Sequence, residues 1–423
     1  MNNIITKKIC DGVNFTYIPS NKFKTTVVSF SAFSNLNKED ISKNSIIPCL
    51  LTNSCKKYPS FLKISTKLEE LYGSSVSKNS GKLGDVQVLT ISAESLNNEF
   101  TQNSENNILE TSKLLCEMIF NPNIVDEKFD EVSLNQEKRQ LIENIQAELN
   151  DKRLYARKKC EEIMCKNEKY GINESVETVQ NLKNEDIFEA WKNILKSSHI
   201  EIIIVGNCEY NLIFDEFKNN FSNIERSNIE KCEQEIVEEI EKITEATEKM
   251  DVTQCKLVMG FRTKIAKPSE DVDAVKVMNA LLGGTPQSKL FLNVREKKSL
   301  CYYCSSRYNP NKGVLFIESG VEKENIDKAK EEILNQIQEI KLGNFSDKDL
   351  LETKLFITQS IQKIDDDLGA LGSWYVSRAF DENKQSPIDA IEKINSISRE
   401  KVIEVARKLS LDTIYTLSGK DEI

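Results

Sequence analysis

The strongest constraint on this fold is an internal repeat, because segments of the first half of the chain recur in the same order in the second half. Segments 175–206 and 386–419 share one plan: a short helix, an amphipathic helix, and an apolar strand that ends in glycine. In both, an apolar period near 3.6 residues gives way to a β-branched run. The chain is therefore expected to contain two similar domains.

Two further pairs of segments support the repeat. Residues 121–145 and 342–361 each combine a turn, an acidic helix start and a long polar helix. Residues 74–94 and 300–320 each read as two strands joined by a turn that contains glycine. Each half thus opens with strands, continues through helices and a hairpin, and closes with a strand. This order predicts an α+β fold, with helices packed on a largely antiparallel sheet.

The boundary between the domains is expected in residues 226–250, which are highly charged, contain no Gly or Pro, and carry Ile at helical spacing. This composition predicts a partly helical linker between an N-terminal domain, 1–225, and a C-terminal domain, 251–423. Two such domains are expected to form a clamshell with a cleft. A single long polar helix is predicted from about residue 126 to residue 167.

Composition excludes several classes of function. The chain of 423 residues has 57 Lys and Arg against 67 Asp and Glu, a net charge of −10, which argues against nucleic-acid binding through a basic field. No apolar run approaches the roughly 20 residues of a membrane span, and nothing resembles a signal peptide. The eleven cysteines are scattered through apolar stretches and read as reduced, packed thiols. We therefore expect a cytoplasmic protein with no membrane partner.

The chain contains one histidine, His199, so any mechanism that needs two imidazoles within this chain is excluded. His199 directly precedes an apolar run and is expected at the entry of a strand. Cys301 and Cys304 form a lone C-x-x-C; on a strand they are expected to point to opposite faces, which disfavours a metal or redox site. Cys160 and Cys165 are expected to be core or half-exposed thiols.

The segment LLGGTPQSKLFLNVREKKSLCYYCSSRYNPNKGVLFIESG, residues 281–320, resembles the C-terminal domain of M16 peptidases, the pitrilysin or mitochondrial-processing-peptidase-like family. The resemblance rests on the Gly-Gly turn and on the REK and LCY motifs. It extends over nearly the whole chain, because KYPS, FNPNIVDEKF and KYG occur in the family's order. It implies two α+β domains of the LuxS/MPP-like metallohydrolase type.

Active members of this family carry His-x-x-Glu-His on the first helix and a Glu on a later helix. Residues three and four apart share one helical face, so two imidazoles reach one Zn²⁺ while the Glu activates its water. Counting back from KYPS places these positions at Ser45, Pro48 and Cys49, and the later Glu falls on Asn144, with Glu143 just before it. The resemblance therefore implies a degenerate site with no zinc or other cofactor in this chain.

The degenerate helix is expected to persist as packing. Pro48 is expected near the helix start, where its missing N–H costs little, and Ser45 or Asn44 could cap that end. These substitutions are compatible with keeping the fold.

The spacing from Arg295 to Tyr302 reproduces the R-x6-Y pair with which family members contact the substrate backbone. In the family this pair comes from the non-catalytic half of the peptide chamber. The resemblance therefore implies a subunit that pairs with a catalytic His-x-x-Glu-His homologue, binds peptide, and supplies Arg295 and Tyr302 in trans, with zinc only in the partner. The pattern is also similar to non-catalytic M16-like proteins associated with 5-aminopentanol modification of elongation factor P, although sequence features alone do not indicate that pathway.

Two other interpretations remain open at this point. The chain could be a stand-alone peptide- or protein-binding assembly protein, such as a homodimer, for which Arg295 would be dispensable. It could also be a true metallopeptidase with an atypical site built from Cys49, Glu143 and other carboxylates. Stoichiometric zinc with chelator-sensitive cleavage would distinguish that second alternative.

Overall fold

The computed structural model describes residues 4–381 and 384–419. The chain forms two compact units, and each half of the sequence contributes one segment to the unit built mainly by the other half. Unit 1 comprises Met1–Ile145, Asn173–Glu233 and Ile364–Lys384. Unit 2 comprises Gln146–Ile172, Gln234–Lys363 and Gln385–Ile423.

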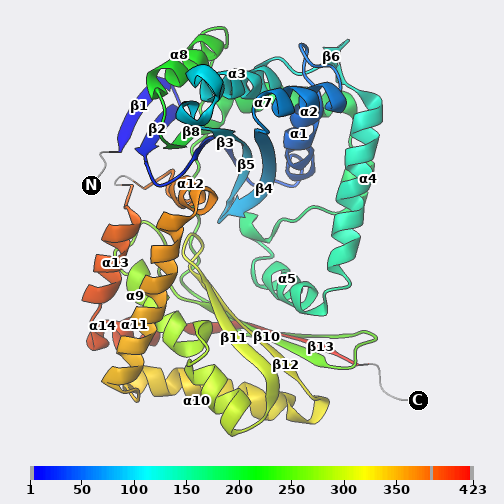
Figure 1. The fold of residues 1–423 in the computed structure, drawn as a ribbon. Helices are drawn as coiled ribbons and strands as arrows, with labels where there is room; N and C mark the ends of the chain where they lie inside the picture. Colours follow the sequence, from blue (N-terminus) through cyan, green and yellow to red (C-terminus); the bar gives the residue numbers. More distant parts are fainter. Residues whose placement is uncertain (1–3, 382–383, 420–423) are drawn as a thin grey trace. The chain divides into compact units, whose positions relative to one another are not determined.

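Unit 1 contains a six-stranded sheet in the order β1-β2-β8-β3-β5-β4 (Figure 1). All neighbouring strands are antiparallel except β2 and β8. The strands are β1 (Ile5–Cys10), β2 (Val13–Pro19), β3 (Thr25–Asn35), β4 (Ser75–Leu83), β5 (Val86–Leu96) and β8 (His199–Gly206). The small hairpin β6 (Ile124–Val125) and β7 (Lys128–Phe129) is separate.

The helices of unit 1 cover both faces of this sheet. They are α1 (Ile41–Asn53), α2 (Phe61–Glu70), α3 (Asn107–Phe120), α4 (Glu131–Glu148, for most of its length), α6 (Val176–Gln180), α7 (Asn184–Ser197), α8 (Tyr210–Phe221) and α12 (Leu368–Val376). Side chains of α1, α3, α7 and α8 form the main core with one face. Helix α12, from the second half of the sequence, packs on the other face against Ile203 and Val205 of β8.

Unit 2 contains a five-stranded sheet in the order β11-β12-β10-β13-β9. The strands are β9 (Thr244–Lys249), β10 (Cys255–Arg262), β11 (Cys301–Asn309), β12 (Val314–Val321) and β13 (Ser410–Ser418). The helices are α5 (Lys152–Met164), α9 (Val272–Asn279), α10 (Ile326–Leu342), α11 (Asp347–Gln362), α13 (Pro387–Ser396) and α14 (Arg399–Arg407). Helix α5, from the first half of the sequence, covers one face through Ala156, Cys160 and Met164.

The predicted α+β fold with two similar domains is confirmed. The order β2-β8-β3-β5-β4 of unit 1 matches the order β9-β13-β10-β12-β11 of unit 2, and the parallel pair occupies the same place in both. The repeat reaches local detail, because Ser175 and Ser386 each form a reciprocal capping box at the start of the corresponding helices α6 and α13. Strand β1 of unit 1 has no counterpart in the sheet of unit 2.

The predicted partly helical linker is wrong in its secondary structure. The described residues between α8 and β9 form no helix, and residues 244–249 form strand β9, the counterpart of β2. The part of the segment up to Glu233 instead bonds along unit 1, where the backbone N–H of Glu230 donates to the Ser197 carbonyl at 2.8 Å and the Glu230 carboxylate accepts from Asn35. A short charged helix without a packing partner is marginal in water, so these contacts decide the conformation.

The predicted long polar helix is also divided. Helix α4 ends at Glu148 and α5 begins at Lys152, and the Asp151 carboxylate caps α5 by accepting from the backbone N–H groups of Arg153 and Leu154. This aspartate is the local signal for the break. The apolar side of α5 packs on the sheet of unit 2.

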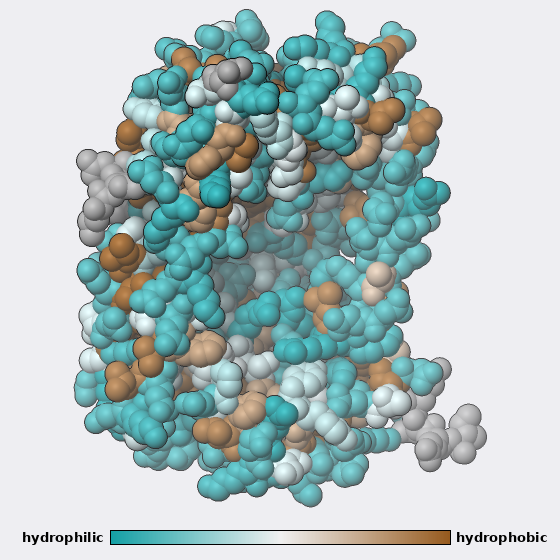
Figure 2. All heavy atoms as spheres, viewed as in Figure 1, coloured by the Kyte–Doolittle hydropathy of each residue, from teal (hydrophilic) through white to brown (hydrophobic). Residues whose placement is uncertain are grey.

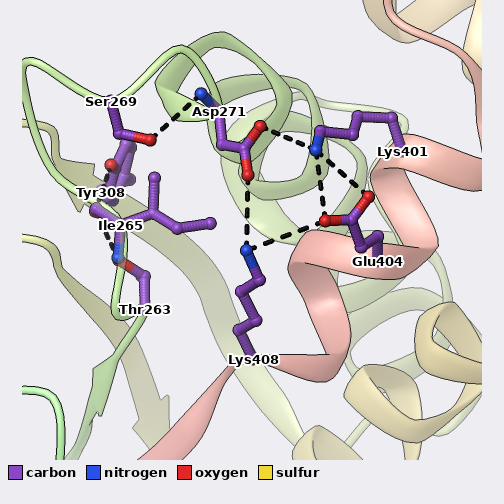
Figure 3. A network of polar contacts seen from close by, with 8 residues as sticks. All are labelled: Thr263, Ile265, Ser269, Asp271, Tyr308, Lys401, Glu404 and Lys408. Carbon is purple, nitrogen blue, oxygen red and sulfur yellow. Dashed lines mark hydrogen bonds and ion pairs between the residues drawn. The ribbon is translucent and has the colours of Figure 1, made fainter.

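Surface ion pairs fasten helices within unit 2. Asp271, directly before α9, accepts from Lys401 at 2.7 Å and from Lys408 at 3.3 Å, and Lys401 also contacts Glu404 at 3.1 Å (Figure 3). The Lys401 ammonium lowers the pKa of Asp271. Because these side chains are partly exposed, the network orients α14 against α9 and adds only modest stability.

The surface shown in Figure 2 is mostly hydrophilic, with hydrophobic side chains scattered in small groups. Within residues 4–381 and 384–419, none of the helices combines the length and apolar character needed to cross a membrane.

Candidate functional site

The position of the first family histidine is Ser45, which lies on α1 of unit 1. Its hydroxyl group forms hydrogen bonds with neighbouring residues of the same unit. Its Oγ lies 2.9 Å from the Ile41 carbonyl and 2.7 Å from Glu174 Oε1. It also accepts from Gln87 Nε2 at 3.0 Å. This hydroxyl therefore links α1 to β5 and to the segment before α6 through hydrogen bonds.

Pro48 lies in the interior of α1, so the expectation that it sits near the helix start is wrong. The helix begins at Ile41, directly after Asp40, so neither Ser45 nor Asn44 caps it; Asn44 is buried and donates to Gln87 Oε1 at 3.2 Å. An interior proline costs a helix about 3 kcal/mol. The helix survives because its other face packs in the core through Ile46, Ile47, Leu50 and Leu51.

The position of the second family histidine, Cys49, is half-buried, and burial raises the pKa of its thiol to about 11. Lys78 of β4 lies against this thiol and acts in the opposite direction, whereas Glu137 of α4 raises the pKa further. A zinc ligand must be a thiolate, so zinc binding at Cys49 would require the loss of a proton, which burial makes harder. The ammonium of Lys78 also opposes a second cation at this place.

The position of the third ligand, on α4, is exposed to solvent. Asn144 and Glu143 are exposed on α4, and Asn144 accepts a hydrogen bond from Gln140 at 3.1 Å. The carboxylate that α4 does bring to α1 is Glu137, which accepts from Asn53 Nδ2 at 2.9 Å and contacts Cys49. The sequence reasoning missed Glu137, although it lies two helical turns before Asn144 and therefore near the same helical face.

These residues do not fit a catalytic zinc ion, which needs three protein ligands. The positions offer a hydroxyl, a proline, a protonated thiol beside an ammonium, and one carboxylate. Across the described part of the chain, no group of three or more His, Cys, Asp and Glu side chains is arranged to hold a metal ion. His199 is the first residue of β8, as predicted, and its Nε2 lies 2.9 Å from the buried Glu201 carboxylate.

The predicted substrate-contacting residues lie in unit 2. Arg295, in the helical segment Leu290–Lys297, is partly exposed, and its guanidinium lies over the Phe291 ring at 4.7 Å. Tyr302, on edge strand β11, is 60% exposed. Its hydroxyl donates to Glu322 Oε1 at 2.6 Å, and this carboxylate raises the pKa of Tyr302. Both polar groups therefore reach the surface of unit 2.

Strand β11 carries a β-bulge at Tyr302. Cys301 pairs with Val321 and Tyr303 pairs with Gly320, so Tyr302 is the extra residue. The bulge places Cys301 and Cys304 opposite Val321 and Ser319, which lie on one face of β12. The prediction that the two thiols point to opposite faces is therefore wrong, because it assumed a regular strand.

Unit 1 also contains a cavity of about 470 Å³ beside α12, lined by both hydroxyl-bearing and apolar side chains. Its floor carries hydroxyl groups that pair across strands, as Ser92 does with Ser29 at 2.8 Å. Among the strands of the described residues, β4 lies at the edge of the sheet and pairs with β5 alone. Ser75, Ser77 and Asn79 of β4 line the cavity.

Fold and site together define a two-domain chain with a peptidase-like architecture whose zinc positions lack the three protein ligands of a catalytic zinc ion. The family model for the "Peptidase M16 inactive domain" matches residues 181–355. The "Probable inactive metalloprotease YmfF" of Bacillus subtilis (strain 168) is 31% identical over 412 residues, which cover 97% of this chain and 96% of that protein. The chain belongs to the M16 peptidase family and is similar to its inactive members.

Solved structures have the same fold. A conserved protein from Enterococcus faecalis V583 is 26% identical with a TM-score of 0.91, and the match covers 100% of both chains. The peptidase M16 inactive domain from Pseudomonas fluorescens is 16% identical with a TM-score of 0.80, covering 99% of this chain and 98% of that chain. The second likeness concerns the fold alone.

Proposed function

We propose that this chain is the non-catalytic subunit of a two-chain M16 peptidase. It pairs with a homologue that carries His-x-x-Glu-His, completes the peptide-binding chamber, and supplies Arg295 and Tyr302 to the substrate. The zinc ion and the activated water belong to the partner. The free thiols throughout the chain fit a cytoplasmic complex.

One observation carries this proposal. The zinc positions on α1 are engaged in contacts within unit 1, as in the Ser45–Glu174 hydrogen bond of 2.7 Å, whereas Arg295 and Tyr302 remain accessible. An Arg and a phenol aimed at a developing oxyanion stabilise it by several kcal/mol in a site without water. In the isolated chain the Tyr302 hydroxyl donates to Glu322, so substrate would have to take over that hydrogen bond.

The edge strand β4 and its cavity support a role in peptide binding. An extended peptide can add to an edge strand of this kind through backbone hydrogen bonds. The hydroxyl-bearing side chains of the cavity can bond to such a peptide without selecting one charge.

The test is reconstitution with a catalytic homologue that carries His-x-x-Glu-His, identified by co-purification with this chain from its native extract. The pair is mixed at defined concentrations, complex formation is measured by light scattering, and cleavage of a fluorogenic peptide is followed. We expect a 1:1 complex whose kcat/KM exceeds that of either chain alone. Arg295→Ala and Tyr302→Phe should each lower kcat/KM by about 10²–10³-fold, the scale of losing one oxyanion donor.

The matched control is Arg307→Ala, which removes an exposed arginine from the same strand, β11. This variant should leave both complex formation and kcat/KM unchanged. A chain that returns alone or only as its own dimer would favour a stand-alone binding protein. Unchanged cleavage with Arg295→Ala in an intact complex would remove the proposed role of that residue.

A further inference from the structure

The bulge at Tyr302 brings two thiols within reach of a disulfide. Cys301 and Cys304 stand opposite Val321 and Ser319, which are two residues apart on β12. At about 3.4 Å per residue, that separation is about 6.8 Å. Disulfides join Cα atoms up to about 6.8 Å apart, so a small adjustment of the bulge allows the bond. Three residues of a regular strand would span about 10 Å.

The two thiols differ in exposure and acidity as a redox pair requires. Cys304 is 4% exposed and packs in the core of unit 2, whereas Cys301 is partly exposed. A hydrogen bond from the Cys304 thiol lowers the pKa of Cys301, against the effect of burial, and the Ser319 hydroxyl and the Arg295 charge act in the same direction. The pKa of Cys304 is raised by the same hydrogen bond and by burial. The exposed member therefore attacks and the buried member resolves.

We propose that Cys301 and Cys304 form a redox-active dithiol that exchanges with low-molecular-weight disulfides. The Cys301 thiolate attacks one sulfur of the disulfide R–S–S–R, forms a mixed disulfide and releases one thiolate. The Cys304 thiol then loses its proton to solvent, attacks Cys301 Sγ and releases the second thiolate. The chain ends with one intramolecular disulfide, and one external disulfide has been reduced to two thiols.

The test uses the full chain in buffers with fixed ratios of oxidised to reduced glutathione at pH 7. Free thiols are trapped with an alkylating reagent at each ratio, and the disulfide is mapped by mass spectrometry. We expect a Cys301–Cys304 disulfide whose fraction rises with the proportion of oxidised glutathione. In Cys304→Ser, a stable glutathione adduct should accumulate on Cys301, and in Cys301→Ser no adduct should form on Cys304.

Other cysteines of the same chain are the controls. Burial raises the pKa of the partly exposed Cys10 and Cys208, the latter to about 12, so their alkylation should be at least about tenfold slower than that of Cys301. Equal alkylation rates, or no Cys301–Cys304 disulfide in wild-type protein at any ratio, would overturn the proposal. The mapping of the Cys301–Cys304 disulfide in wild-type protein tests the proposal even if the Cys304→Ser variant is unstable. It does not involve a partner subunit, so the proposed function and this inference stand or fall separately.

Discussion

Arg262 Nη2 and Glu168 Oε1 lie 2.7 Å apart in the interior of unit 2, although the two residues come from different halves of the sequence. Glu168 also accepts from Lys312 at 2.8 Å, and Arg262 donates to Asp412 at 2.8 Å. Arg262 is 2% exposed and Lys312 is 1% exposed. This network fastens the segment Gln146–Ile172 to strands β10 and β13 and to the turn between β11 and β12.

Replacing Glu168 with glutamine should destabilise the protein strongly. The change keeps the shape of the side chain but leaves two buried cations with one carboxylate fewer, and breaking a buried ion pair typically costs about 3–5 kcal/mol. Urea unfolding should show this loss as a lower midpoint. Glu162→Gln on α5, which removes a more exposed carboxylate paired with Lys159, should cost less than about 1 kcal/mol. Equal effects of the two substitutions would contradict the role given to the buried network.

Acid should weaken unit 1 through Glu201. This buried carboxylate bonds to His199, Lys384 and Asn14, and although burial opposes its charge, these contacts hold its pKa below the ordinary value of 4.5. Its folded pKa is depressed, so its contribution to stability is complete above pH 4.5 and is lost as pH falls through the folded pKa.

The measurement is the Tm of wild type and of Glu201→Gln between pH 3 and pH 7. The variant should be less stable near neutral pH, and the gap between the two proteins should narrow in acid. Parallel curves would show that Glu201 is not the titrating group.

Gly206 should be irreplaceable, unlike its counterpart Gly419 in the repeat. Gly206 has a φ of +140°, and an added Cβ would lie 2.2 Å from Thr26 Oγ1. Thr26 itself bonds to Asn97 and to the backbone N–H of Asn207, so it has little room to move. Gly206→Ala should therefore cost roughly 2–3 kcal/mol. At Gly419 an added Cβ would meet the Val252 carbonyl at 3.2 Å, so Gly419→Ala should cost clearly less in the same thermal unfolding assay.

Zinc should not stabilise the isolated chain. A catalytic site saturated at 100 times its Kd would add about 2.7 kcal/mol, which is readily seen in Tm. Because the site offers one thiol and one carboxylate beside the ammonium of Lys78, we expect no increase in Tm on adding Zn²⁺ and no decrease on adding a chelator. Stoichiometric zinc after dialysis, lost in Cys49→Ser, would instead support the atypical metallopeptidase considered above.

Much of the architecture could be predicted because it depends on local patterns that occur twice. The helix, helix and strand plan of residues 175–206 and 386–419 appears as α6, α7 and β8 and as α13, α14 and β13. Strand β9 was missed, because TEATEK is polar and lies beside β13 at a sheet edge, where none of its residues is fully buried. The exchange of α5 and α12 between units was also missed, since amphipathic periodicity identifies an apolar face but not the sheet that will cover it.

The residues of the candidate site also fall into two groups, those predicted from the sequence and those that only the structure identified. Arg295 and Tyr302 were predicted from the resemblance to the M16 family, in which they match the R-x6-Y pair, and their action on a substrate stays a prediction. Glu137 and the adjacent thiols of Cys301 and Cys304 required the structure, because helix rotation and a one-residue bulge decide which side chains meet.

The sequence by itself determined that this chain has a duplicated α+β core and, with a single histidine, that it lacks the two imidazoles of the zinc motif. Residue identity and period carry that information. Tertiary structure alone decided that Glu168 of the first half pairs with Arg262 of the second, that Lys78 lies against Cys49, and that the bulge at Tyr302 aligns two thiols. These contacts depend on strand register and on packing between segments distant in sequence, which no local pattern encodes.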